Sequence, residues 1–327
     1  MTRHFGHNDI SSPKQNGKQG IEICFLEHKL LPIQKEAIML KNIDFELVRQ
    51  NDKNYREKDI LFMIGTGSLG NNYDHGFLDY PVYAFTENYS HGHVEDWHSH
   101  DRVQLIHTLT GVIRVQTTEG TWVTPPGRGV WIPAYQLHAL HISGDVQAYG
   151  VFIEPDARDQ LVNHCRVVSI SPLLKELIRH AMQIQSPIQP HSREQRLLEL
   201  ILDEVALLNV LPFNLPEPQN IKLQKLCVAI KNDLAQDWSL AHAAALLHIS
   251  PKTLTRHFQK ETQMHFSHWV RQARLMQAMI DLAMNKSIFN VALDLGYDSA
   301  SAFSAMFKRE TSLTPSEYIQ QFQSDSL

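Results

Sequence analysis

The sequence predicts a multidomain protein: a small all-β jelly-roll barrel, followed by an all-α domain with two helix-turn-helix units. Two observations predict it. Residues 80–155 alternate short runs of Val, Ile, Thr and aromatic residues with Gly, Asp and Pro, a pattern typical of short antiparallel strands. Residues 238–258 and 287–307 then repeat one pattern of two short helices joined by a turn.

Length and composition are those of a globular protein with two domains. The chain has 327 residues, of which 43% are hydrophobic and 20% charged. Its apolar runs are too short to cross a membrane, so no membrane partner is expected. Three scattered cysteines, Cys24, Cys165 and Cys227, form no CxxC pair and predict a cytoplasmic location.

Charge is divided unevenly along the chain. The net charge is −5, but residues 221–327 contain 11 Lys and Arg against 9 Asp and Glu, a net of +2. Residues 1–220 contain 19 Lys and Arg against 26 Asp and Glu, a net of −7. The basic groups therefore gather in the segment with the repeated helices, which modestly favours phosphate contact there.

Residues 1–76 form an extension that the sequence defines poorly. The first twenty residues are polar and rich in Gly, Ser and Asn, which predicts disorder. Residues 65–72 (GTGSLGNN) resemble a phosphate loop, but the Lys-Ser/Thr that such a loop requires is missing. We therefore interpret them as a flexible joint.

Four polar residues of the predicted barrel, residues 77–155, form a candidate site: His98, His100, Gln104 and His138. His98 and His100 are two apart, so on a strand they would point the same way. Gln104 and His138 follow on later strands, and His138 could close on the first two inside the barrel. Three histidines can hold zinc, nickel or iron, but the neutral amide of Gln104 is a weaker ligand than a carboxylate.

Aromatic residues near this cluster suggest a cavity. We expect Trp97, Trp131 and Tyr135 to supply apolar walls for a small aromatic or heterocyclic effector. The cluster is thus open to two interpretations, a ligand-binding site without metal or a divalent metal site, and no cofactor is required by the first.

Two amphipathic helices, residues 172–185 and 192–210, are predicted within residues 156–211. They could mediate dimerisation or simply pack on their own barrel. Residues 212–220 (PFNLPEPQN) contain three prolines, which stop a helix and predict a stiff linker.

The repeated units in residues 221–327 match position by position. Ala244 corresponds to Ala292, 48 residues later, and Phe258 corresponds to Phe307, 49 residues later. The offset grows by one across the turn, so the turn of the second unit is one residue longer. An 18-residue helix, residues 266–283, should join them and span roughly 27 Å. With the flanking turns, the two recognition helices would lie about one duplex turn apart, roughly 34 Å.

The second helix of each unit carries exposed positions suited to DNA. In the first, about residues 251–262, Arg and Lys can pair with guanine and Thr with thymine. These positions are Lys252, Thr253, Thr255, Arg256 and Gln259. In the second, about residues 299–309, they are mostly short: Ser301, Ala302, Ser304, Ala305 and Lys308. We expect the first helix to discriminate sequence more strongly, while Lys308 contacts phosphate.

Residues from about 221 to 322 resemble the DNA-binding domain of the AraC family of bacterial transcription regulators. The matching residues are Ser250, Pro251, Arg256, His257, Phe258, Arg274, Leu275, Ala292, Gly296, Tyr297, Ser301, Phe303, Phe307, Pro315, Ser316, Glu317 and Tyr318. The resemblance implies that both recognition helices enter successive major grooves of promoter DNA, with RNA polymerase as a further partner.

Residues 80–155 resemble the cupin-like sensor domain of the NimR-like AraC subfamily, through WHSHDRVQLIH, GVIRV and PPGRGVWIP. In cupins the positions of His98, His100, Gln104 and His138 hold metal, the third usually being Glu. The resemblance implies a transcription regulator that responds to a small-molecule effector and is not an enzyme. The alternatives are a metal-dependent cupin enzyme fused to a DNA-binding domain, or a metal-sensing regulator. In this family the helix pair after the sensor domain often mediates dimerisation, so a homodimer is one of the two arrangements open to residues 156–211.

Overall fold

The computed structural model describes residues 80–159 and 161–324. The expectations for residues 1–76, and Cys24 with them, lie outside this part of the chain. Among the described residues, no helix is both long enough and apolar enough to cross a membrane.

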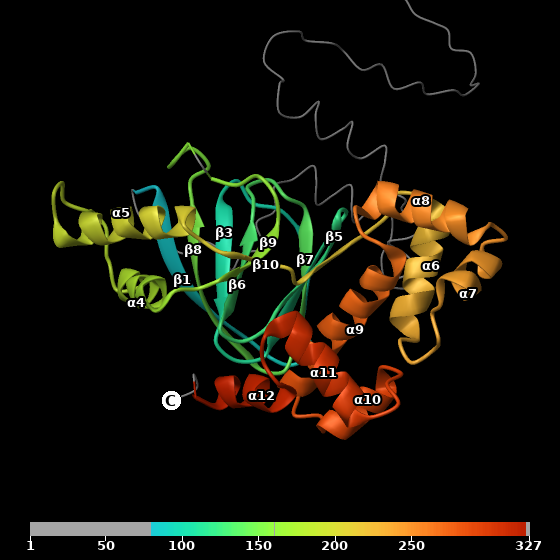
Figure 1. The fold of residues 1–327 in the computed structure, drawn as a ribbon. Helices are drawn as coiled ribbons and strands as arrows, with labels where there is room; N and C mark the ends of the chain where they lie inside the picture. The colour runs from blue at the N-terminus through green and yellow to red at the C-terminus, as the bar shows by residue number, and fades with distance from the viewer. Residues whose placement is uncertain (1–79, 160, 325–327) are drawn as a thin grey trace, which may run out of the picture. The chain divides into compact units, whose positions relative to one another are not determined.

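The predicted barrel is confirmed, and eight strands lie between residues 80 and 155. Figure 1 shows them in the ribbon. They are β1 (Val82–Tyr89), β2 (Val94–His98), β3 (Val103–Thr108), β4 (Val112–Thr117), β5 (Gly120–Thr124), β6 (Arg128–Ile132), β7 (His138–Ser143) and β8 (Val146–Ile153). Alternation of inward and outward side chains in short β-branched runs gives these strands a buried face, except β2, whose residues are exposed or half-buried.

Two antiparallel sheets make up this domain. The order is β1-β8-β3-β6-β9-β10 in the first and β11-β5-β4-β7-β2 in the second, where β9 is Arg166–Ser169, β10 is Val210–Leu211 and β11 is Asn214–Pro216. Between them lies a core that includes Phe85, Ile106, Ile113, Leu140 and Phe152. Neighbouring residues on one strand face opposite ways: Ile106 belongs to this inner core, while Leu105 belongs to a second core on the outer side.

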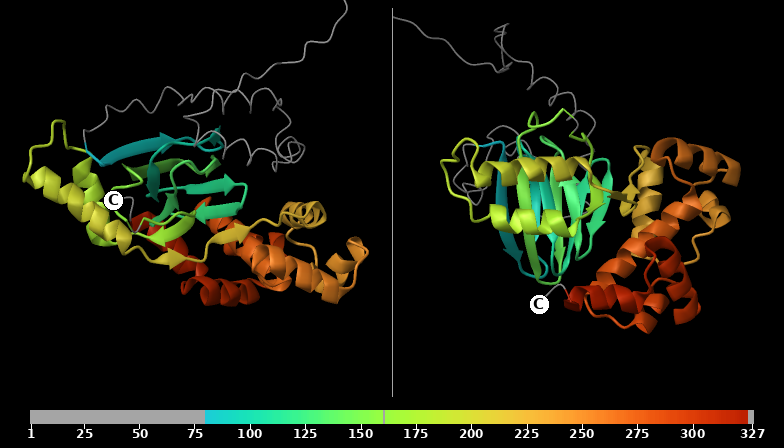
Figure 2. Two further views of the ribbon diagram at one scale, coloured as in Figure 1. Left: turned by 90° about the horizontal axis from the view of Figure 1, so that it is seen from above. Right: turned by 60° about the vertical axis from the view of Figure 1, so that its left-hand side comes forward.

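The outer core is covered by two helices, α4 (Pro172–Ala181) and α5 (Arg193–Ala206). Figure 2 shows them lying across the strands. Ser171 and Ser192 cap their first turns, and Leu174, Ile178, Leu198 and other apolar residues pack on the sheet. Packing of the helix pair on its own barrel is therefore observed. Both helices end four residues before the predicted positions.

Segments before α4 and after α5 contribute three strands that the sequence did not predict. β9 (Arg166–Ser169) pairs with β6, β10 (Val210–Leu211) pairs with β9, and β11 (Asn214–Pro216) pairs with β5. Part of the expected linker thus belongs to the sheets. Pro216 is tolerated in β11 because β11 is an edge strand.

The helical domain contains both predicted helix-turn-helix units. The first is α7 (Leu240–Leu246) with α8 (Pro251–Thr262), and the second is α10 (Ile288–Asp294) with α11 (Ala300–Thr311). α6 (Ile221–Asn232) precedes them, α9 (Phe266–Ala283) joins them and α12 (Pro315–Ser324) follows. The predicted bounds of α8 and α9 are confirmed. Leu254, Phe258, Phe303 and Phe307 are fully buried, as their four-residue spacing predicts.

Candidate DNA-binding and effector sites

Helix α8 holds its predicted contact residues outside the core. Ser250 accepts a hydrogen bond from the Thr253 backbone N–H at 3.1 Å, which fixes the start of the helix. Lys252, Arg256 and Gln259 are exposed. Thr253 and Thr255 are half-buried, and the Thr255 hydroxyl donates to the Pro251 carbonyl at 3.0 Å. Its methyl group therefore remains the better candidate for a base contact.

Helix α11 presents a flatter surface. Ser299 caps it by accepting from the Ala302 N–H at 3.1 Å. Ser301, Ala302, Ala305 and Lys308 are exposed and Ser304 is half-buried. All ten predicted DNA-contact positions are thus at least partly accessible. Among these positions, the exposed side chains of α8 are long, whereas those of α11 are short except for Lys308.

The histidines of the barrel come together, although not as two residues of one strand. β2 ends at His98, and His100 lies in the connection to β3. A bulge between Glu95 and His98 sets two residues of β2 against one of β7, and it brings the side chains of Glu95 and His98 onto one face. His138 is the first residue of β7 and the pairing partner of His98.

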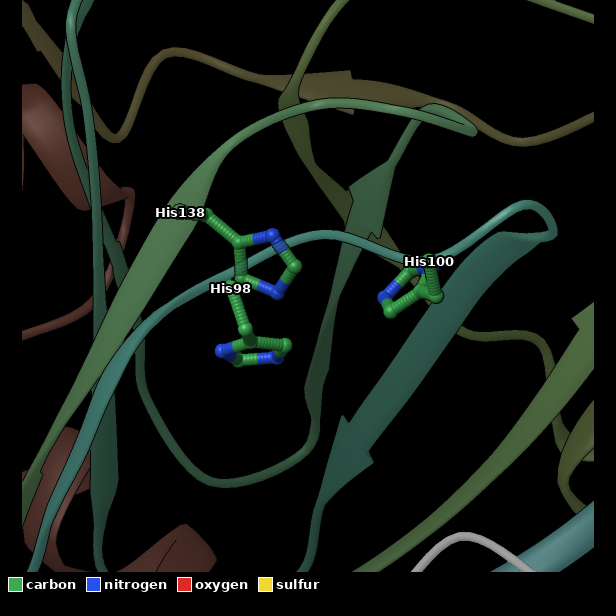
Figure 3. A group of neighbouring side chains, drawn as sticks. All are labelled: His98, His100 and His138. Atoms are coloured by element: carbon green, nitrogen blue, oxygen red, sulfur yellow. The ribbon is translucent and has the colours of Figure 1, made fainter. Parts of the chain in front are cut away.

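His98, His100 and His138 form one cluster in which a ligand atom from each lies within 4.8 Å of the others. The ring centroids of His98 and His138 are 4.2 Å apart, and those of His100 and His138 are 5.2 Å apart. Figure 3 shows the three rings together, with His98 and His100 from the end of β2 and the connection after it, and His138 from β7.

The backbone fixes the tautomer of each ring. Nδ1 of His98 lies 2.7 Å from the Asp96 carbonyl, Nδ1 of His100 2.6 Å from that of Arg102, and Nδ1 of His138 2.7 Å from that of Gln136. A carbonyl only accepts, so each Nδ1 carries a proton, and in the neutral ring Nε2 keeps its lone pair. This is the arrangement that metal-binding histidines use.

Burial keeps two of the rings neutral. His138 is fully buried, and burial, followed by the neighbouring His98 and His100, holds its pKa well below the usual value. Burial also lowers the pKa of His100. The Nε2 atom of His138 is buried and has no hydrogen-bond partner. A neutral imidazole with an unused lone pair can accept from a ligand donor or bind a cation.

Gln104 joins the cluster through His100, and Glu95 is a residue that the sequence interpretation missed. Oε1 of Gln104 lies 3.0 Å from Nε2 of His100; because that nitrogen accepts, the contact becomes a hydrogen bond when the amide presents its NH₂ group. Oε1 of Glu95 lies 3.6 Å from Nε2 of His98. Glu95 therefore brings a carboxylate to the site, and only the bulge, invisible in the sequence, places it there.

The expectation that Trp131 lines a cavity beside the histidines is wrong. Trp131 is fully buried in the outer core under α4 and α5, and its indole N–H donates to the Val162 carbonyl at 2.9 Å. Leu105, its pairing partner, points to the same side. Tyr135 is 65% exposed, and its backbone N–H donates to the His100 carbonyl at 2.7 Å, so it positions the His100 loop.

A jelly-roll barrel with a buried polar cluster, followed by two capped helix-turn-helix units, defines a ligand-responsive DNA-binding protein. Comparisons with known proteins agree. The family described as "AraC-like ligand binding domain" matches residues 80–201, and the family described as "Helix-turn-helix domain" matches residues 243–321.

The transcriptional regulator NimR of Escherichia coli (strain K12) is 30% identical over 222 residues, covering 68% of this chain and 81% of NimR. The activator RhaR of Mannheimia succiniciproducens is 24% identical over 205 residues, covering 55% of this chain and 74% of RhaR. The solved structure of ToxT from Vibrio cholerae covers 74% of this chain, but a TM-score of 0.31 at 11% identity makes that overlay too loose for any argument. The chain belongs to the AraC family of helix-turn-helix transcriptional regulators.

Proposed function

We propose that the protein works in the bacterial cytoplasm as a sequence-specific promoter-binding regulator, with α8 carrying more of the sequence discrimination than α11. The observation that carries this proposal is the exposed set on α8, where Arg256, Lys252 and Gln259 have the length to reach base edges. The exposed side chains of α11 are short apart from those at its C-terminal end. Binding to a native promoter duplex and to its scrambled version, at one fixed salt concentration, tests sequence specificity.

The effector site is proposed to be the cluster of His98, His100, Gln104 and His138. Support comes from the buried, unpartnered Nε2 atom of His138 and from the fixed tautomers around it. An effector bound there would shift the population of domain or dimer arrangements, and so place the recognition helices on their half-sites. RNA polymerase is the partner through which the regulator would change transcription.

A divalent metal ion is a second candidate for this site, and the donor set fits one. One ring nitrogen from each of the three imidazoles lies within 4.8 Å of the others, and each Nδ1 already has its carbonyl acceptor. His98, His100 and His138 would hold the ion, with Gln104 and Glu95 beside them. Such an ion would supply a charged centre for effector recognition, which makes the protein a metal-responsive regulator.

Metal titration of the chelator-treated full chain tests the second candidate. Binding of Zn²⁺ or Ni²⁺ at 100 times its dissociation constant should stabilise the fold by about 2.7 kcal/mol, visible as a higher melting temperature. His98→Ala should remove this increase. His141→Ala is the matched control, because His141 lies three residues along β7 from His138 and contacts Gln116 instead. No increase in either protein would leave the organic effector as the proposal.

A homodimer is proposed through the outward side of α5. Leu200 and Leu207 are 39% and 75% exposed there, while the inner side of the helix packs on the sheet. Sedimentation of the full chain and of a Leu200→Lys, Leu207→Lys variant tests this, since charge on an apolar interface should leave monomers.

The matched relatives are transcriptional regulators rather than enzymes, and we assign no catalytic role to the barrel.

A further inference from the structure

A recess of about 440 Å³ lies between α9 and α11. Its apolar part comes from Trp238, Val270 and Met306, and three arginines border it: Arg271, Arg274 and Arg309. Ala302 and Ala305, two of the exposed positions of the second recognition helix, also line it. The recess is therefore continuous with the surface proposed to enter a major groove.

Arg274 has a structural task at this recess. Its Nε donates to the Leu234 carbonyl at 3.0 Å and its Nη2 to the Gln236 carbonyl at 2.9 Å. Its guanidinium also lies over the Tyr297 ring, 5.7 Å from the centroid. These contacts hold the segment before α7 against α9, so Arg274 contributes positive charge but is not free to move.

Arg271 and Arg309 share one carboxylate oxygen instead. Nε and Nη2 of Arg309 donate to Oε1 of Glu310 at 3.1 and 3.0 Å, and Nε of Arg271 lies 3.5 Å from the same atom. That Nε atom is buried and makes no hydrogen bond. One carboxylate thus serves two guanidinium groups, and it satisfies the Arg271 group poorly.

The exposures of these three side chains suggest an exchangeable anion. Arg271 and Arg309 are 41% and 62% exposed, whereas Glu310 is 22% exposed. An ion pair this open to solvent contributes little to stability. A phosphate offers several acceptor oxygens, and guanidinium groups bind it bidentately. A phosphate at the recess would therefore satisfy both arginines better than Glu310 does.

We propose that this recess binds the DNA phosphodiester backbone beside the groove entered by α11, and that Glu310 holds Arg271 and Arg309 in place of phosphate until DNA arrives. The inference rests on the DNA-binding function but not on sequence readout. The ligand is DNA rather than a small anion, because Ala302 and Ala305 of the recognition helix form one wall of the recess. When DNA binds, Arg271 and Arg309 must then break their ion pairs with Glu310, whatever the base sequence.

The test is Glu310→Gln in the full chain, measured on native and scrambled duplexes. Removing the competing charge should tighten binding to both by a similar factor, about two- to fivefold, the range expected for an exposed ion pair. Arg271→Ala and Arg309→Ala should weaken binding to both, and each should lower the slope of log K against log salt by about 0.9. In the double Arg271→Ala, Arg309→Ala background, Glu310→Gln should change nothing.

Glu176→Gln is the matched control. Glu176 pairs with Arg179 at 2.7 Å on exposed α4, outside the helical domain, so its loss removes the same charge and the same kind of pair without touching DNA. Tightening by Glu310→Gln on the native duplex alone, or tightening that persists in the double-alanine background, would overturn the proposal. So would the opposite pattern, in which inorganic phosphate at constant ionic strength displaces DNA and Glu310→Gln strengthens only phosphate binding. If the unmodified chain did not prefer its native duplex, the proposal of sequence-specific regulation would be wrong. Binding to the scrambled duplex would still test the phosphate contacts of the recess.

Discussion

Arg256 and Ala305 occupy equivalent positions in the two recognition helices, and they differ most in reach. Arg256 is exposed on α8, on the side away from Leu254 and Phe258. Arg256→Ala should cost about 1–3 kcal/mol of binding at the native site, the usual contribution of a bidentate base contact. Random DNA should lose much less, because that binding depends on phosphates.

Ser301→Ala and Ser304→Ala on α11 are the matched comparison. Each removes only one hydroxyl, so each should cost less than Arg256→Ala at the native site. The measurement is binding of all three variants to native and scrambled duplexes at one salt concentration. An equal loss on both duplexes would make Arg256 a phosphate contact, and a larger loss for Ser301→Ala would reverse the assignment of the two helices.

At the scale of single residues, the sequence predicted which residues gather but not always where they face. The spacing of His98, His100 and His138 was enough to predict the cluster. The direction of Trp131 was not predictable, because β6 is buried on both faces and an uninterrupted apolar strand does not reveal which face is the inner one. Glu95 was missed because a bulge has no sequence pattern as clear as a turn.

Among the elements, those with caps and periodic apolar residues were predicted best. Ser250 followed by Pro251 fixes the start of α8, and the bounds of α8 and α9 agree with expectation. β10 and β11 were missed because two or three residues carry no periodicity. They exist only because β9 and β5 present open edges to them.

The turn of the second helix-turn-helix unit depends on Gly296. Gly296 has φ of +74°, and its equivalent in the first unit, His248, has φ of +54°. A left-handed backbone therefore does not by itself demand glycine here. A Cβ atom at Gly296 would, however, overlap the Ala235 carbonyl. Gly296→Ala should destabilise the helical domain by about 2–4 kcal/mol, combining left-handed strain with overpacking.

His248→Ala is its matched control, since it also places alanine in a left-handed turn position but with no glycine lost. Urea denaturation of both variants should show a large loss for Gly296→Ala and about 0.5 kcal/mol or less for His248→Ala. Similar losses in both would mean that backbone strain, rather than the approach of Ala235, sets the requirement for glycine.

For the molecule as a whole, the order of barrel, helix pair and duplicated helical units followed from pattern alone, but the start of the helical domain did not. The sequence places it at residue 221, after a proline-rich linker. In the structure, the Trp269 indole N–H donates to the Pro216 carbonyl at 2.8 Å. Gln272 donates to the Pro212 carbonyl. Buried groups of α9 thus take their acceptors from residues that sequence composition marks as a connection.

Two fragments, residues 212–327 and 221–327, should therefore differ in stability. The shorter one loses the acceptors of Trp269 and Gln272, and it loses Asn220, whose side chain caps α6 by accepting from the Lys222 and Leu223 N–H groups. A lost cap costs about 1 kcal/mol, and an unsatisfied buried donor costs about 1–3 kcal/mol. Urea denaturation followed by tryptophan fluorescence should show the shorter fragment less stable by about 3–7 kcal/mol, the cap and both donors together. Asn220→Ala in the longer fragment, the control, should account for only the cap.

Both fragments should still prefer the native duplex over its scrambled version, because all ten proposed contact residues lie on α8 and α11. Neither should respond to effector or metal, since the histidine cluster is absent from them. Equal stability of the two fragments would show that residues 212–220 act only as a connection. Loss of duplex preference in the stable longer fragment would mean that the barrel or the helix pair takes part in DNA recognition, and the division of function between the domains would then be wrong.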